Sequence, residues 1–157
     1  MSEAQRFGLR FFVVLAAFSV FAWLVSLPDQ LGAVQRSIAQ AAGAVARLAG
    51  STNHVHDDQI QAKELSIHVN HECTGIYVLI ILFTFLLSYP ARWRRRLLGI
   101  VVGTAGLTAV NILRLSFQVR IAEIRPPLFE YFHEYVWQGV LLVLVVAYAM
   151  SWVEHGR

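Results

Sequence analysis

Four apolar stretches constrain the fold of this chain most, because a membrane-spanning helix needs about 20 mostly apolar residues. They occupy residues 7–27, 74–90, 97–119 and 134–153. Hydrophobic residues make up 57% of the chain and charged residues only 15%, which is not the composition of a soluble domain. The sequence therefore predicts an all-α membrane protein, a four-helix transmembrane bundle that forms a single domain over residues 1–157.

Basic residues predict how these helices are oriented. Arg6 and Arg10 flank the first stretch, and the connection "ARWRRR" between the second and third stretches carries four more arginines. Because cytoplasmic loops are enriched in Lys and Arg, we expect both termini and this connection in the cytoplasm. Residues 28–72 and the Arg120–Glu134 loop are then outside. No A-x-A site closely follows the first stretch, so we expect it to be retained rather than cleaved as a signal peptide.

The outer segment 28–72 predicts an amphipathic helix followed by a short hairpin. Asp29 is the expected N-cap and Gly50 the expected stop. The helix would lie on the outer leaflet or on the other helices. Alternating residues in "LSIHVN" predict a strand, with "TNHVH" as its hairpin partner. The apolar positions at helical spacing are Leu31, Val34, Ile38, Ala41, Val45 and Leu48.

Three polar residues on different helices are expected at one depth. Counted from the cytoplasmic ends of their helices at about 1.5 Å per residue, Cys73, Arg114 and His133 lie roughly 28, 27 and 31 Å across. The hydrocarbon core is about 30 Å thick, so all three should lie near its outer boundary. Each also has a simpler interpretation. Cys73 would be a small apolar filler, Arg114 would snorkel to the headgroups, and His133 would mark a helix start at the interface. A charge five residues inside an apolar helix, however, usually faces the bundle with a partner.

A thiol, an imidazole and a guanidinium at one membrane-edge site suit acyl transfer. Cys73 is the only cysteine, so it has no internal disulfide partner. Its thiolate would be the nucleophile, with a pKa that a nearby cation lowers. The histidine can move protons near neutral pH. The arginine can donate hydrogen bonds to the thiolate or to a tetrahedral oxyanion.

Three motifs carry a resemblance to a known family. "HECTGIY" resembles the E-x-C-[ST]-G signature of exosortases and archaeosortases, and "NILRL" resembles their N-x-x-R element. "FHEYVWQGV" is similar to the F-H-x-x-x-x-x-G region that opens their last helix. The motifs cover residues 64–150 in the order Cys, Arg, His. Most relatives have more spans, so the chain resembles the compact members, exosortase H foremost among them.

The resemblance implies a membrane-embedded cysteine transpeptidase or protease of the bacterial inner membrane, with its active site at the outer face. Its substrates would be exported proteins with a C-terminal sorting signal: a short motif of the IPTL-x-x-W-G type, a transmembrane helix and basic residues. Cys73 would be the nucleophile, Arg114 the oxyanion or thiolate partner, and His133 the general acid/base. Membrane lipids would surround the enzyme, and a lipid or glycan could accept the acyl group. No cofactor, metal or nucleic acid is expected, and the oligomeric state is left open.

Five further residues are close enough in sequence to support these three side chains. Thr74 fits equally well, together with Gly75, as the cap and start of the second membrane helix. The five are Glu72, Thr74, Tyr77, Asn111 and Gln118.

Two alternatives compete with an enzyme. The first is a metal-binding or transport protein, since several metal-ligating side chains lie within twenty residues of one another. The second is a non-catalytic membrane subunit, because Gly99 and Gly103 form a G-x-x-x-G pair that mediates either dimerisation or packing within the bundle. Nucleic-acid binding is disfavoured, since no soluble scaffold presents the arginines. The metal-ligating candidates are His54, His56, Asp57, Asp58, His68, His71 and Cys73.

Overall fold

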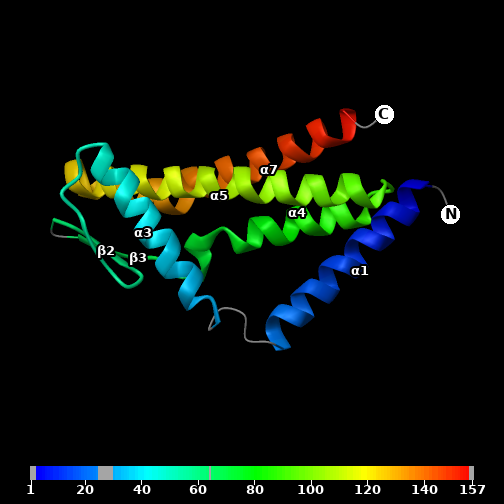
Figure 1. The fold of residues 1–157 in the computed structure, drawn as a ribbon, viewed down its shortest axis with the longest axis horizontal. Coiled ribbons are helices and arrows are strands. Elements are labelled where there is room, and N and C mark those ends of the chain that lie inside the picture. Colours follow the sequence, from blue (N-terminus) through cyan, green and yellow to red (C-terminus); the bar gives the residue numbers. More distant parts are fainter. Residues whose placement is uncertain (1–2, 25–29, 64, 156–157) are drawn as a thin grey trace.

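The computed structural model describes residues 3–24, 30–63 and 65–155, without the side chains at positions 3, 4, 22, 133 and 134. Most of the described chain is helical, with a small sheet at one end (Figure 1). Two of the described helices, α5 and α7, are long and apolar enough to cross a membrane, and α4 is apolar but shorter. The helices are α1 (Glu3–Leu24), α3 (Gly32–Leu48), α4 (Ile76–Ser88), α5 (Trp93–Ile124), α6 (Pro126–Tyr131) and α7 (Trp137–Glu154).

Helix α5 is the scaffold of the molecule, and its length accommodates a subdomain of α3 and the sheet, here called the outer subdomain after the side of the membrane on which we expect it. Its 32 residues extend roughly 48 Å at 1.5 Å per residue. A bilayer core takes up only about 30 Å of this length. If Trp93 marks the inner boundary, the helix therefore leaves the hydrocarbon near Arg114, and the rest projects beyond it. Helix α3 and the sheet pack on this projecting part (Figure 1).

The sheet has three antiparallel strands in the order β1 (His54–His56), β2 (Gln59–Ala62) and β3 (Leu65–His68). The predicted pairing of "TNHVH" with "LSIHVN" is wrong, because β2 lies between them and pairs with both. Connections of only two residues allow three short strands to form in this segment. Asp57, at φ 53°, supplies the left-handed residue of the first and Lys63, at φ 52°, that of the second.

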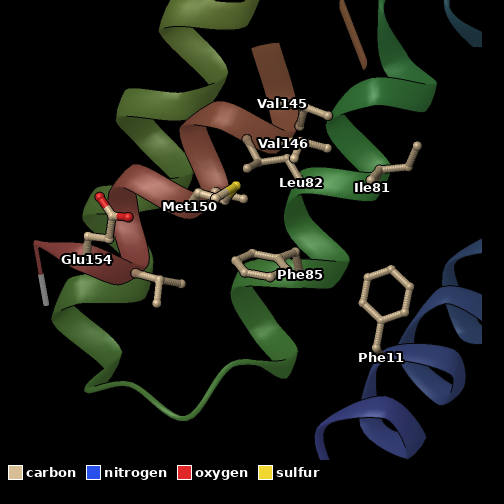
Figure 2. Close-up of a pocket in the computed structure, with 10 residues that line it drawn as sticks. Phe11, Ile81, Leu82, Phe85, Val145, Val146, Met150 and Glu154 are labelled. Atoms are coloured by element: carbon tan, nitrogen blue, oxygen red, sulfur yellow. The ribbon is translucent and has the colours of Figure 1, made fainter. Parts of the chain in front are cut away.

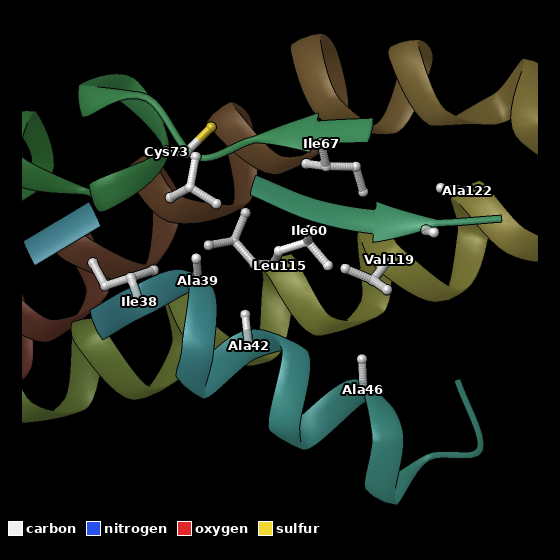
Figure 3. Packing of buried hydrophobic residues seen from close by; sticks show 12 residues of the cluster. Ile38, Ala39, Ala42, Ala46, Ile60, Ile67, Cys73, Leu115, Val119 and Ala122 are labelled. Carbon is white, nitrogen blue, oxygen red and sulfur yellow. The ribbon is translucent and has the colours of Figure 1, made fainter. Parts of the chain in front are cut away.

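The outer core lies between α3, the sheet and α5 (Figure 3). Small residues of α3 point into it, so that the backbones of α3 and α5 approach closely. Ser116 on α5 donates to the carbonyl of Ala42 at 3.0 Å. A helix, α3, lies where the amphipathic helix is expected and packs on α5. Its predicted apolar face is partly wrong, since Val34 is 44% and Leu48 89% exposed. The buried face is Leu31, Ile38, Ala39, Ala42, Gly43 and Ala46.

The expected end of α3 is confirmed. Gly50 has φ 85°, the left-handed conformation that glycine adopts without strain. Its N–H donates to the carbonyl of Arg47 at 2.9 Å, and the N–H of Ser51 donates to that of Ala46 at 3.0 Å. These two bonds satisfy the last carbonyls of the helix. The expected N-cap, Asp29, lies outside the described residues, and α3 begins after Leu31.

Two glycines of α5 allow close packing of this helix against α4 and α7. A Cβ added at Gly99 would lie 2.5 Å from Nε1 of Trp152, and one at Gly103 would lie 2.6 Å from Cδ2 of Leu82. The G-x-x-x-G pair therefore serves packing within the bundle, one of its two predicted roles. Tyr148 of α7 also donates its hydroxyl to the carbonyl of Gly99 at 2.7 Å.

The predicted outer loop Arg120–Glu134 is wrong, because most of it is helical. Helix α5 continues to Ile124, and α6 follows after Arg125. Pro126 and Pro127 explain the short break. Proline fits the first turn of a helix, where its missing N–H has no partner to lose. A π-helical turn, η2 (Phe132–Val136), then leads directly into α7.

The start of α1, the α4–α5 connection and the end of α7 lie at one end of the molecule (Figure 1). Helix α3 and the sheet lie at the other end. This arrangement is the one that the arginine pattern requires, since the basic connection and both terminal helix ends share a side.

Candidate active site

Cys73 lies in a 3₁₀ turn, η1 (His71–Thr74), that joins the sheet to α4. Asn70 caps this turn: its side-chain Oδ1 accepts from the N–H of Cys73 at 3.1 Å. The same N–H also donates to the backbone carbonyl of Asn70 at 3.0 Å, so Asn70 holds it through both its side chain and its backbone. Gly75, at φ 75°, then turns the chain into α4. The thiol therefore lies at a defined corner just before the apolar helix α4.

Asn111 connects the Cys73 turn to α5. Its Nδ2 donates to the backbone carbonyl of Cys73 at 2.8 Å. Its Oδ1 accepts from Nη1 of Arg114 at 3.3 Å. Two of the three residues expected at one depth, Cys73 and Arg114, are therefore brought together through one amide.

Arg114 is buried, with only 5% of its surface exposed. Within the described part of the chain, its Nε is buried without a hydrogen-bond partner. A guanidinium holds five N–H donors in a fixed fork, so a donor that its neighbours leave unused can serve a ligand. The charge on Arg114 acts on the Cys73 thiol. This supports the interpretation of Arg114 as a partner inside the protein rather than a snorkelling side chain.

The Cys73 thiol is 2% exposed and packs within the outer core (Figure 3). Burial raises its pKa above the ordinary value, because desolvation disfavours the thiolate. The Arg114 charge and the Asn70 backbone oppose this rise, and the Glu72 carboxylate adds to it. The thiol is therefore mostly protonated at neutral pH, so that a nucleophilic role requires a base.

The third predicted residue, His133, lies on η2, but its side chain is outside the described residues. The position of η2 is set by two aromatic neighbours. Phe132 and Trp137 lie against Phe117 of α5, with ring centroids 6.0 and 5.7 Å away. Phe117 is one helical turn beyond Arg114. The turn that carries His133 thus packs on α5 at Phe117, one turn beyond Arg114.

The other predicted supporting residues have mixed positions. Thr74 is buried and donates to the carbonyl of His71 at 2.6 Å, as expected of a residue that shapes the helix start. Tyr77 is 50% exposed, and its ring lies against that of His71. Glu72 is exposed. Gln118 is fully buried on α5, one turn beyond Arg114.

Asn70 was not among the predicted site residues, although it holds the N–H of Cys73. The signal that could have found it is its spacing. An asparagine three residues before a helical position is a common N-cap, because its side chain reaches the N–H of the third residue. Together, Asn70 and Asn111 occupy both polar groups of the Cys73 backbone.

Two apolar grooves lie along α4. One, of about 450 Å³, lies between α3, α4 and α5 and includes Thr74, next to Cys73. The other, of about 420 Å³, lies between α1, α4 and α7, with Phe11 and Phe85 lining it (Figure 2). Only the first adjoins the candidate nucleophile.

The metal interpretation gains no support from the sheet. Among the described residues, no group of three or more His, Cys, Asp or Glu side chains is placed to hold a metal ion. His68 pairs with Asp58 at 3.2 Å and His56 with Asp57 at 3.5 Å. His56 and His68 lie in one row of the sheet, but Gln59 of the middle strand separates them.

Comparison with known proteins identifies the family. A model of the transmembrane exosortase family matches residues 3–153. No curated protein and no solved structure matches the chain. Because the match covers nearly the whole chain, this protein belongs to the transmembrane exosortases. Membership indicates a membrane transpeptidase that acts on sorting signals.

Proposed function

We propose that this protein is a cysteine transpeptidase or protease that cleaves the C-terminal sorting signals of exported proteins through a thioester. The observation that supports it most is the Cys73–Asn111–Arg114 arrangement. In it, one amide links a buried cation to the turn that carries the chain's only thiol, just before α4. Acyl transfer needs a nucleophile, which the thiol supplies, and a nearby cation that stabilises its thiolate.

The first step forms the thioester. His133 accepts the Cys73 proton, and the thiolate attacks the scissile carbonyl. The carbonyl electrons move to oxygen, which accepts a hydrogen bond from Arg114. Collapse of this intermediate breaks the C–N bond, and His133 returns the proton to the leaving amine. The C-terminal helix of the substrate is thereby released.

The second step transfers the acyl group. An amine, a hydroxyl or water attacks the thioester and loses its proton to His133. Cys73 leaves as a thiolate and takes this proton back from His133, which restores the enzyme. A lipid or glycan acceptor would anchor the exported protein, and water would release it.

The substrate reaches the thiol along the groove between α3, α4 and α5. Its lining is mostly apolar and includes Thr74, next to the candidate nucleophile. The 2% exposure of Cys73 means that the peptide must displace residues packed on the sulfur. In the same proposal, α1 and α4 complete a four-helix transmembrane bundle in the inner membrane, with both termini cytoplasmic.

Processing in cells tests this function. The wild type and a Cys73→Ala variant are co-expressed with a tagged protein from the same genome that carries a C-terminal sorting signal. Cleavage with the wild type alone supports the proposal, and the mass of the new terminus identifies the acceptor. Equal cleavage with both proteins removes Cys73 from the chemistry and favours a non-catalytic subunit.

His133 has its own test in the same assay. We expect His133→Ala to be inactive near neutral pH, because the raised thiol pKa makes a base necessary. A normal rate would assign the proton transfer to another base. His71 is the first alternative, since it lies in the same turn as Cys73.

A further inference from the structure

Asn111 makes the direct side-chain link between the candidate nucleophile and its cation. We propose that Asn111 is a positioning residue that fixes the Arg114 guanidinium beside the Cys73 thiol, a role that rests on the function proposed above. The residue itself need not touch the substrate. It acts by holding together two groups that come from different elements and lie 41 positions apart in sequence.

The two hydrogen bonds of Asn111 are consistent with only one orientation of its amide. Because Nδ2 donates to the Cys73 carbonyl, Oδ1 must face Arg114. A flipped amide would place its NH₂ group against the guanidinium and its oxygen against the carbonyl, and both contacts would be repulsive. The orientation of the amide is therefore fixed, and one Nη1 donor of Arg114 is fixed with it.

Burial makes this arrangement rigid. Asn111 is 2% exposed and lies against Gly75, where an added Cβ would be 3.5 Å from its Cγ. Gly75 is the residue with φ 75° that turns the chain from η1 into α4. The same close packing thus holds the Cys73 carbonyl and the Asn111 amide. Nε of Arg114 is left without a partner in the described structure, as a donor for the reacting oxygen.

The charges near the thiol show why loss of Asn111 would change the pKa of Cys73. Among the described residues, the charged groups that act on Cys73 are Arg114 from α5 and Glu72 from its own turn. The elements α3 and α4 also pack on this turn but add no charge to these two. A displaced or neutralised Arg114 would leave burial and Glu72 unopposed, apart from the Asn70 backbone.

A second asparagine provides a matched control. Asn53 is also 2% exposed, and its Nδ2 donates to a backbone carbonyl, that of Gly43, at 3.1 Å. Its Oδ1 accepts from Nη1 of Arg47 at 3.2 Å. Asn53 therefore makes the same pair of bonds as Asn111, with one more from Nδ2 to the Ser51 hydroxyl at 2.8 Å, but in the outer subdomain between α3 and β1. Its loss costs comparable hydrogen bonds without touching the thiol.

The experiment measures the rate of iodoacetamide alkylation of Cys73 against pH in the full chain in detergent. Cys73 is the only cysteine, so the intact mass reports one site. The midpoint of the profile gives the thiol pKa whatever the accessibility of the sulfur. The variants are Asn111→Asp, Asn111→Ser, Asn53→Asp and Asn53→Ser. Thermal unfolding of each is followed in parallel, and kcat and KM are measured on a sorting-signal peptide.

For Asn111→Asp we expect the midpoint to rise by about one pH unit, so that alkylation at a fixed lower pH is roughly tenfold slower. The new carboxylate compensates the Arg114 charge and repels the Cys73 carbonyl. Asn111→Ser is too short for both bonds and should shift the midpoint in the same direction. On the peptide, kcat should fall while KM stays near that of the wild type. The Asn53 variants should unfold earlier and keep the wild-type midpoint.

An unchanged midpoint in both folded Asn111 variants would overturn the proposal. Equal shifts in the Asn53 variants would also overturn it, as would failure of both Asn111 variants to fold when the Asn53 variants fold. In that last case Asn111 would be a structural residue only. The titration needs no substrate, so a shifted midpoint without any peptide cleavage would keep the positioning role and reject the proposed function.

Discussion

At the scale of single residues, the site depends on what Arg114 can donate. Its Nη1 is engaged by Asn111, while Nε has no partner in the described residues. Only a planar fork can do both, because a lysine ammonium is a point charge at the end of a flexible stem. The geometry of the guanidinium therefore matters as much as its charge.

Arg114→Lys should consequently lose most activity, by roughly 100-fold or more in kcat, the usual cost of removing one oxyanion donor. Peptide cleavage by purified protein measures this. Arg120→Lys is the control, since Arg120 lies on the same helix but pairs with Glu123 at 2.7 Å. Full activity of Arg114→Lys would exclude the oxyanion role.

The burial of the Cys73 thiol should be visible in how the rate of its alkylation depends on pH. Because burial raises the pKa of the Cys73 thiol above that of an ordinary thiol, the protonated form persists to higher pH. The rate of alkylation of the wild type should therefore still be rising at a pH where an exposed thiol is already ionised. A short unstructured cysteine peptide, measured alongside, should level off at a lower pH. A plateau of the protein near pH 7 would mean that Arg114 outweighs desolvation.

At the scale of elements, α5 joins two packing surfaces. Its first half contacts α4 and α7 through glycines, and its last turns carry the outer subdomain. Glu123 fixes this second contact. Its carboxylate accepts from the Ser51 hydroxyl at 2.6 Å, the Thr52 N–H at 3.0 Å and Arg120 at 2.7 Å.

Glu123→Gln should loosen the outer subdomain from α5, because a neutral amide cannot replace a carboxylate that accepts three hydrogen bonds. We expect the free energy of unfolding to fall by about 2 kcal/mol. Hydrogen exchange should quicken in α3 and the sheet but not in α7. Glu130→Gln, at an exposed position, is the control. Unchanged protection of α3 would show that packing alone holds the subdomain.

The glycines of α5 allow a second test at this scale. Gly103→Ala should destabilise the bundle by about 1–3 kcal/mol, since its Cβ would lie 2.6 Å from Leu82 and 2.8 Å from Tyr148. Gly106→Ala is the matched control, with nothing within 4 Å and a gain in helix propensity. Thermal unfolding in detergent compares the two. Equal stabilities would mean that α4 and α7 do not pack tightly on α5.

These elements also show what can be predicted from a sequence. Gly50 ended α3 as expected, because a left-handed residue after a helix depends on local chemistry alone. The buried face of α3 was not predictable from hydropathy. The face was selected by how closely α5 approaches, which favours Ala42 and Gly43 over the larger Val34 and Leu48.

The predictions of the sheet and of the site were each right only in part, and the residues explain why. Strand β2, with the sequence Gln-Ile-Gln-Ala, has only two apolar residues and was missed. Cys73 and Arg114 were predicted together because helical rise converts sequence distance into depth. Asn70 escaped that argument, since it acts through a cap rather than through its depth.

At the scale of the whole molecule, Figure 1 places α3 and the sheet opposite the α4–α5 connection. We predict that a reporter active only outside the cytoplasm works when inserted after Gly50 and fails after Pro90. The expected asymmetry follows from the arginines of the connection, which favour the cytoplasmic side. Activity at both positions would reject the proposed orientation.

The central claim is that Cys73 forms a thioester with the substrate, and direct capture of this adduct tests it best. The wild type and the Cys73→Ala variant are each incubated with a sorting-signal peptide, quenched in acid and analysed by mass spectrometry. We predict an adduct on the Cys73 peptide of the wild type that carries the residues before the cleaved bond and is removed by neutral hydroxylamine. Cleaved peptide without any adduct, and the same cleavage by Cys73→Ala, would contradict the account.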